Sequence, residues 1–293
     1  MKTILVPTDF SISSIHGLEY AANIARKDRS KLCIFNVAQT GNYYYAGDPA
    51  GIGPPVSIMM EGINESLKKA AFLKLEALRK RQFLKGLNVD IDCDTSPNVH
   101  NTILKFADSI KADLIVMGSK GSGNIKSILL GSTAERVVRF SSRPVIVIPA
   151  KTKKPNPEVI VFASDFMAEA YGIFPVVVGF ASLFKAQIRL LKVNTMDQFS
   201  RTGDDKDRIR KFNRKFGGKF EITIYNDYMK EEGILNFAGE SKADLIAIGT
   251  HGKKGLKRFF SEDVSEGIVR LSSIPIMIVN LKKFKSKSDI LSK

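Results

Sequence analysis

The sequence predicts an α/β protein built from two tandem, doubly wound sheets, each with five parallel strands. Three observations lead to this prediction: the chain repeats itself, strand-like and helix-like segments alternate in each repeat, and the strands are continuously apolar. Such alternation produces parallel sheets with right-handed helical crossovers. Continuous apolar runs indicate strands that are buried on both faces.

The repeat is visible in several blocks. The segment ADLIVMGSKG at 112–121 recurs as ADLIAIGTHG at 243–252, which is 131 residues later, and ILKFA recurs as ILNFA at the same offset. Near the start of each half, ILVPTDF resembles VIVFASDF, with Asp9 opposite Asp165 at an offset of 156. The two offsets differ by 25 residues, so we expect an insertion in the first half, in the Gly-, Pro- and Tyr-rich segment 40–59.

The elements of the first half follow in a regular order. We expect strand 3–6, helix 13–27, strand 31–37, helix 60–83, strand 87–92, helix 99–110, strand 113–118, a helix from Ser132 and strand 144–148. The second half repeats this order after a basic, proline-bearing segment at 150–158. The predicted domains are therefore 1–150 and 151–293.

Composition bounds the class of protein. Hydrophobic residues make up 44% and charged residues 26% of the 293 residues, as in folded globular proteins. We expect no signal peptide, and the apolar run 172–184 contains Pro175 and is too short to span a bilayer. Cys33 and Cys93 lie in strand-like segments, which favours buried thiols over a disulfide or a metal site. Together these features predict a cytoplasmic protein.

The formal net charge is +15, concentrated at 206–219, 253–258 and 282–293. Such runs favour anionic partners in general, but solvated helix faces and a frayed tail are the preferred explanation. No recognised nucleic-acid-binding motif is present, which argues against nucleic acid as a partner.

The glycine-rich segment 118–132 fails two well-known phosphate-loop patterns. A Walker loop needs Lys where Asn124 stands, and a dinucleotide fingerprint needs Gly where Lys126 stands. What remains is Gly118, Gly121 and then Gly131-Ser132 before a helix.

Ser132 and Glu135 fit a capping box, with Ser132 as the residue that caps the helix. The start of a helix carries unpaired N–H groups and about half a positive charge, which suits a phosphate. Lys120 and Lys126 add charge nearby. A tight turn with an ordinary cap and no ligand remains the alternative.

Gly-x2-Gly-x9-Gly-Ser after a strand, together with VPTDFS near the start, resembles the universal stress protein family in its tandem, two-domain form. The resemblance covers nearly the whole chain except 40–59 and the basic tail. It implies Rossmann-like domains of the adenine-nucleotide-binding type, with ATP and a divalent ion such as Mg²⁺. By position, the implied ligand-binding residues are Pro7, Thr8, Asp9 and Val37 at the base and ribose, Met117, Gly118, Lys120 and Gly121 at ribose and phosphate, and Gly131, Ser132 and Thr133 at the phosphates. The insertion would act as a lid or an oligomer contact.

The second copy of the loop differs at its end, because Glu262 and Asp263 stand where the first has Gly131 and Ser132. Asp263 still caps the helix, but a like-charge contact with phosphate near 4 Å costs about 4 kcal/mol at an effective dielectric of about 20. We therefore expect no ATP in the second half. His251 is interpreted as a loop residue.

No catalytic constellation is apparent. His16, His100 and His251 are scattered, and no Gly-x-Ser-x-Gly motif occurs. The prediction is an ATP-binding stress-response regulator and not an enzyme, although slow ATP hydrolysis or self-phosphorylation is compatible with it. A nucleotide-free interaction scaffold and a nucleic-acid-associated basic protein are the alternatives.

In single-domain relatives the final strand commonly pairs with a second subunit. We therefore expect PVIVI at 144–148 and PIMIV at 275–279 to pair within this chain as an intramolecular pseudo-dimer. The helix around 172–184 is apolar on more than one face, so we expect a homodimer contact there; the alternative is that it packs under the insertion or against the other half.

Overall fold

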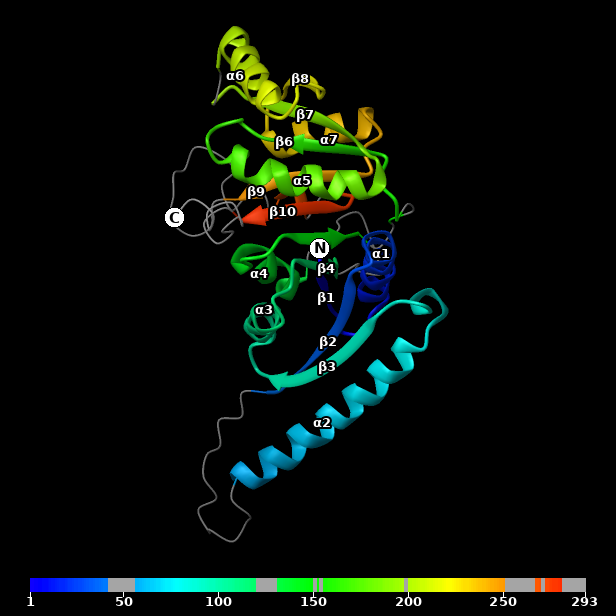
Figure 1. Cartoon of the computed structure of the whole chain (residues 1–293). Helices are drawn as coiled ribbons and strands as arrows, with labels where there is room; N and C mark the ends of the chain where they lie inside the picture. The colour runs from blue at the N-terminus through cyan, green and yellow to red at the C-terminus, as the bar shows by residue number, and fades with distance from the viewer. Residues whose placement is uncertain are drawn as a thin grey trace, which may run out of the picture.

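The computed structural model describes residues 1–41, 56–119, 131–149, 152, 155–197, 200–250, 267–269 and 272–280, with the backbone alone at 56–59 and 250. Ten strands form one sheet in the order β3-β2-β1-β4-β5-β10-β9-β6-β7-β8 (Figure 1). Their bounds are β1 Thr3–Pro7, β2 Lys31–Gln39, β3 Val89–Ser96, β4 Leu114–Gly118, β5 Val145–Ile148, β6 Val159–Ala163, β7 Gln187–Asn194, β8 Glu221–Asn226, β9 Leu245–Thr250 and β10 Ile276–Asn280.

The two halves meet at the predicted strands. All neighbouring strands run parallel within each half, and β5 pairs antiparallel with β10, with Ile146 opposite Met277. The predicted pair of five-stranded parallel sheets and their intramolecular pseudo-dimer are thus confirmed.

Helices cover both faces of the sheet (Figure 1). The helices are α1 Ile12–Asp28, α2 Val56–Arg79, α3 Val99–Ser109, α4 Ser132–Phe140, α5 Ala170–Phe184, α6 Thr202–Lys215 and α7 Lys230–Glu240, with a 3₁₀ turn η1 at Gln82–Leu84. One core, under α1, α2, α5 and α6, contains Ile4 and Val6; the other, under α3, α4 and α7, contains Leu5. Successive strand residues point to opposite faces, so the continuous apolar runs fill two cores at once.

The long helix of the first half is displaced from its predicted place. We expected it over 60–83, whereas α2 begins at Val56, within the segment assigned to the insertion, and ends at Arg79. The rest of that segment from 42 to 55 lies outside the described residues. In the sequence, Pro54 and Pro55 directly precede Val56. Proline at the start of a helical segment is a start signal, and assigning all of 40–59 to the insertion passed over it.

The apolar helix α5 packs inside the chain. Its residues Ile173, Phe174 and Val177 are buried in the first core, and the helix contacts α1 of the other half. Of the contacts expected for the apolar run 172–184, the structure shows packing against the other half of the chain. The expected homodimer stays a prediction. No helix among the described residues has the length and apolarity needed to cross a membrane.

Candidate functional site

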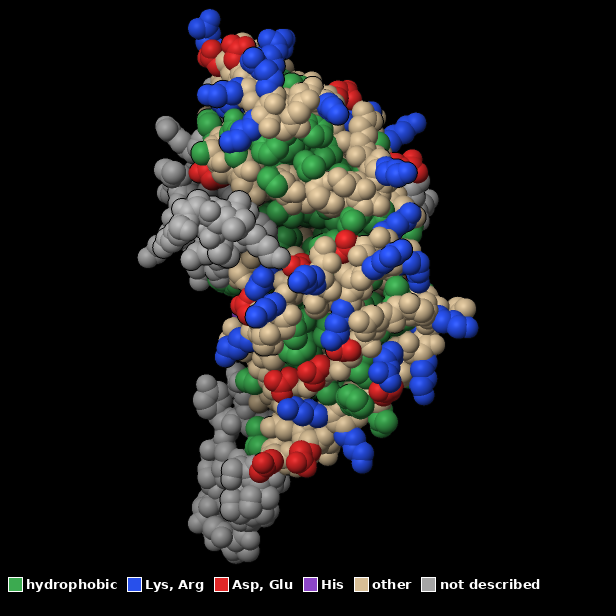
Figure 2. Space-filling view, in the orientation of Figure 1, with side chains coloured by type: hydrophobic (Ala, Val, Ile, Leu, Met, Phe, Trp, Pro, Cys, Tyr) green, Lys and Arg blue, Asp and Glu red, His purple; other side chains and the backbone are tan. Residues whose placement is uncertain are grey.

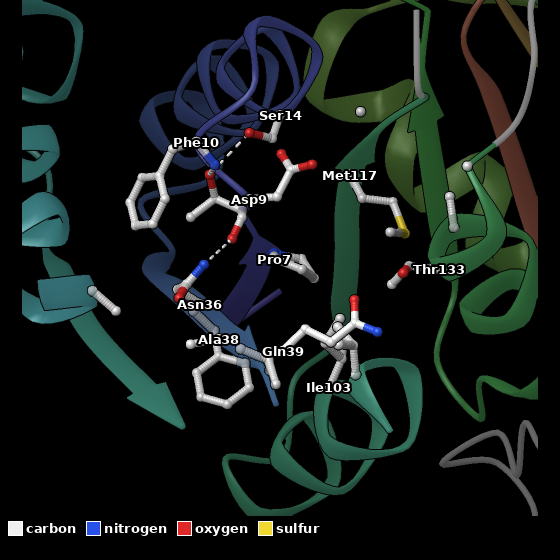
Figure 3. A pocket seen from close by; sticks show the side chains of 18 of the residues that line it. Pro7, Asp9, Phe10, Ser14, Asn36, Ala38, Gln39, Ile103, Met117 and Thr133 are labelled. Atoms are coloured by element: carbon white, nitrogen blue, oxygen red, sulfur yellow. Dashed lines mark hydrogen bonds between the residues drawn. The ribbon is translucent and has the colours of Figure 1, made fainter. Parts of the chain in front are cut away.

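A pocket of about 540 Å³ lies at the carboxyl ends of β1, β2 and β4, bounded by α2, α3 and the start of α4. In open parallel sheets this edge is where ligands bind. Figure 3 shows Phe10 and Thr133 on opposite sides of the pocket, with Pro7 and Asp9 between them.

The structure brings most of the predicted ligand-binding residues together around this pocket. Those that line it are Pro7, Thr8, Asp9, Val37, Met117, Gly118, Gly131, Ser132 and Thr133. Lys120 and Gly121 lie outside the described residues. Their role in binding a ligand stays a prediction.

Hydrogen bonds fix the turn between β1 and α1. The Thr8 hydroxyl is 2.9 Å from that of Ser14 and accepts the amide of Phe10 at 3.1 Å. The Asn36 side-chain amide donates to the Thr8 carbonyl at 2.7 Å (Figure 3). Phe10 has φ of 64°, a conformation that costs a non-glycine residue free energy and needs such support. The turn is therefore held in one shape at the pocket wall.

Asp9 is the carboxylate of the pocket. Burial disfavours its charged form, but hydrogen bonds from the side chain and the amide of Ser11 outweigh burial and lower the pKa of Asp9 below its ordinary value. Both bonds end on Oδ1. Asp9 is thus ionised at neutral pH and can accept hydrogen bonds from ligand hydroxyl or amino groups.

Gly118 lies where the end of β4 meets the start of α1. A Cβ there would lie 2.0 Å from the Ser13 carbonyl oxygen, and a Cβ on Gly17 would lie 2.7 Å from the Gly118 nitrogen. The start of α1 therefore packs directly on the end of β4, and side chains at either position would push them apart. Packing inside the protein therefore requires glycine at position 118, and the predicted role of Gly118 at ribose and phosphate stays a prediction.

The start of α4 also differs from the prediction. Gly131 is the N-cap residue, with φ −65° and ψ 140°, and Ser132 is the first helical residue, so the predicted role of Ser132 in a capping box is wrong. Gly131 has no side chain to accept from the first-turn amides. The positive end of this helix therefore opens on the pocket without the usual capping oxygen.

The sequence reasoning missed the residues that α2 and α3 contribute. Apolar side chains Leu67, Val99 and Ile103 line the pocket, as does Lys74, whose ammonium lies 5.5 Å from the centre of the Phe10 ring. Val99 and Ile103 are four residues apart on α3, a spacing that marks one helix face. For the α2 residues no comparable signal exists, because nothing in the sequence shows that this helix reaches the pocket.

The second half has a different arrangement at the corresponding place. Asp165 is 6% exposed, and its two carboxylate oxygens bind Lys192 at 2.8 Å and Lys230 at 2.9 Å. By the offsets of 156 and 131, Lys192 replaces Asn36 and Lys230 replaces Val99. The strand registers support this equivalence. Asn36 lies one residue beyond the last position of β2 that pairs with β1, and Lys192 lies one residue beyond the last position of β7 that pairs with β6.

This buried cluster was also missed, although the offsets could have revealed it. Arg208 extends it, donating to the Asp165 carbonyl at 3.4 Å and pairing with Asp205 at 3.1 Å. The residues on which the sequence argument relied, Glu262 and Asp263, lie outside the described residues, as does His251.

The cysteines form no disulfide with each other. Cys33 and Cys93 are both free thiols, and burial raises the pKa of Cys33 to about 11. Among the described residues, no group of three or more His, Cys, Asp or Glu side chains is arranged to hold a metal ion.

Comparisons with known proteins agree with this architecture. The sequence model of the universal stress protein family matches residues 1–149 and 159–280. A universal stress protein of Methanocaldococcus jannaschii is 35% identical over 159 residues, covering 54% of this chain and 85% of that protein. A second one from the same organism is 30% identical over 157 residues, covering 51% and 96%.

A solved structure supports the fold across both halves. The crystal structure of a universal stress protein from Archaeoglobus fulgidus matches with a TM-score of 0.74 at 20% identity, covering 95% of this chain and 98% of that one. With two consecutive matches to the family along its length, the chain belongs to the universal stress protein family as a tandem member.

Proposed function

We propose that this protein is a stress-response regulator that binds ATP with Mg²⁺ in its first half only, and that binding rather than turnover is its purpose. In this proposal residues 1–150 form the nucleotide-binding domain and 151–293 a degenerate one. The observation that carries it is the contrast between the two halves. The first has an open pocket beside an uncapped helix start, and the second has a buried carboxylate held by two lysines.

The residues of the pocket fit an adenine nucleotide. A volume of about 540 Å³ is within the usual range for small-molecule sites. The amides at Gly131, Ser132 and Thr133 suit phosphate oxygens. The ionised Asp9 suits ribose hydroxyl or base amino groups, and Val37 with the apolar lining suits a flat base.

Mg²⁺ would be held mainly by phosphate oxygens, as is usual for this ion. The pocket offers Asp9 as the carboxylate to assist. The ion would neutralise phosphate charge that the helix start only partly offsets.

The second half is a poor host for the same ligand. A nucleotide at the equivalent place would have to separate Asp165 from two ammonium groups that are themselves 4% and 6% exposed. Leaving buried charges without partners costs several kcal/mol, about 3–5 when one member of a buried pair is removed. The fold keeps its core there without a ligand.

The test is a thermal-shift titration with Mg-ATP on the natural chain and on Gly131→Glu. We expect ATP to raise the melting temperature of the natural chain and not that of the variant, because the new carboxylate stands at the phosphate position. Gly203→Glu is the matched control: it makes the same change in the first turn of α6, where a Cβ meets no atom within 4 Å. An equal response of natural chain and Gly131→Glu would contradict the proposal.

A further inference from the structure

Six basic side chains gather at the end of the first half that is opposite the pocket. They are exposed, and they come from the end of α1 and from the connection between α2 and β3. We call them the basic end patch, which consists of Arg26, Lys27, Arg29, Lys80, Arg81 and Lys85. Figure 2 shows Lys and Arg side chains gathered over the side where α2 ends and β3 begins.

Specific contacts hold the two segments of the patch together. The guanidinium of Arg26 donates to the carbonyl of Phe83 at 2.8 Å. Leu84, 2% exposed, anchors η1 in the same core as α1. Lys80, Arg81 and Lys85 flank this anchored turn in sequence, so the six charges share one surface.

Nearby acids do not neutralise the patch. Asp28 pairs with the chain's amino group at 2.9 Å, Glu76 with Arg79 at 3.0 Å, and Asp90 with Lys31. Within the described part of the chain, the six patch residues form no ion pair. The two helix ends supply only about half a negative charge each, which leaves a clear excess of positive charge.

The fold itself does not require the three charges at the end of α1. At the equivalent end of α5, an offset of 156 places Ser182 and Leu183 where the first half has Arg26 and Lys27, and only Lys185 keeps its charge. The same helix therefore ends without a basic cluster in the second half. The like charges of the patch repel one another, and capping of the helix does not account for them.

We propose that the basic end patch binds the phosphate backbone of duplex nucleic acid without reading its sequence. Arginine and lysine contacts to phosphates provide this kind of affinity. The patch also differs from the basic runs at 206–219, 253–258 and 282–293 that the sequence makes obvious.

The pocket and the patch are independent sites. The pocket lies at the carboxyl ends of the strands, whereas the patch follows α1 and precedes β3, at their amino ends. A nucleotide in the pocket therefore does not compete with a polyanion on the patch.

The test measures binding of the full chain to a fluorescent DNA duplex of about 30 base pairs by anisotropy at several salt concentrations. The test variant is Lys80→Ala/Arg81→Ala/Lys85→Ala. The matched control is Lys206→Ala/Lys211→Ala/Arg214→Ala, which removes the same charge from exposed positions on α6. Six phosphate contacts predict a slope of log K against log salt near −5, at about −0.9 per contact, and the test variant should lose about half of it.

Four outcomes would overturn the proposal. They are no binding at about 50 mM salt, an equal loss in both variants, binding of anionic phosphatidylserine vesicles in place of the duplex, and unchanged affinity of the test variant. Circular dichroism melting of both variants checks that each is folded. At constant ionic strength and constant free Mg²⁺, ATP should leave duplex affinity unchanged.

Discussion

The buried cluster of the second half permits a direct test of the asymmetry between the two repeats. Asp165→Asn keeps the shape of the side chain but removes the charge that holds Lys192 and Lys230. Both lysines are nearly inaccessible, at 4% and 6% exposure. Removing one member of a buried ionic group costs about 3–5 kcal/mol, which at about 2–3 °C per kcal/mol lowers the melting temperature by roughly 6–15 °C.

Asp9→Asn is the internal control, because Asp9 occupies the same position in the first repeat. Asp9 is exposed and its hydrogen bonds come mainly from Ser11, so the loss of its charge should cost no more than about 1 kcal/mol. Urea unfolding and differential scanning calorimetry of both variants provide the comparison. Equal costs in the two variants, or a cost below about 1 kcal/mol for Asp165→Asn, would refute the argument.

A third variant separates lost charge balance from general damage. Asp165→Leu/Lys192→Met/Lys230→Met removes the carboxylate together with both of its lysine partners, and apolar replacement of buried ion pairs is often neutral or stabilising. We expect it to recover most of the stability that Asp165→Asn loses. Further loss would mean that packing, and not the unpaired charge, is responsible.

Three further predictions follow from single positions. Gly118→Ala should destabilise the fold by about 1–3 kcal/mol in urea unfolding, because its Cβ would lie 2.0 Å from a backbone oxygen of α1, whereas Gly179→Ala, with open space around it, should be neutral or stabilising. The lowered pKa of Asp9 adds stability that is present above the pKa of the unfolded chain and is lost as pH falls through the pKa of the folded chain. Ser11→Ala should abolish most of this acid dependence, and the loss of Ser11 as helix cap should cost about 1 kcal/mol. Melting curves at several pH values would show both effects. Cys33, with its pKa raised to about 11 by burial, should react with a thiol reagent at pH 7 only when the chain unfolds.

The arrangement of the strands was predictable because it depends on patterns that survive in one sequence. Apolar runs such as β4 and β9 recur at a fixed offset, and their burial on both faces leaves little freedom for other pairings. The β5–β10 pairing was predictable for a related reason, since an unpaired apolar edge strand is unfavourable in water.

The wall of the pocket was harder to predict, because it depends on how distant elements meet. Leu67 and Lys74 reach it only because α2 packs along β2 and β3, and no local pattern encodes that direction. The capping-box motif assigned the N-cap of α4 to Ser132. The backbone has extended φ and ψ angles at Gly131 and is helical from Ser132, so Gly131 is the N-cap residue. Lys192 and Lys230 were passed over because lysine in a sequence normally indicates a solvated surface.

The antiparallel seam between β5 and β10 has a consequence for how such a protein can diverge. In a symmetric dimer of identical subunits every substitution appears in both sites, so two lysines that close one pocket would close the other as well. Here the partner surfaces belong to one polypeptide, and their pairing does not weaken on dilution. In the function proposed above, this arrangement lets one repeat keep a ligand while the other serves as a structural support for it.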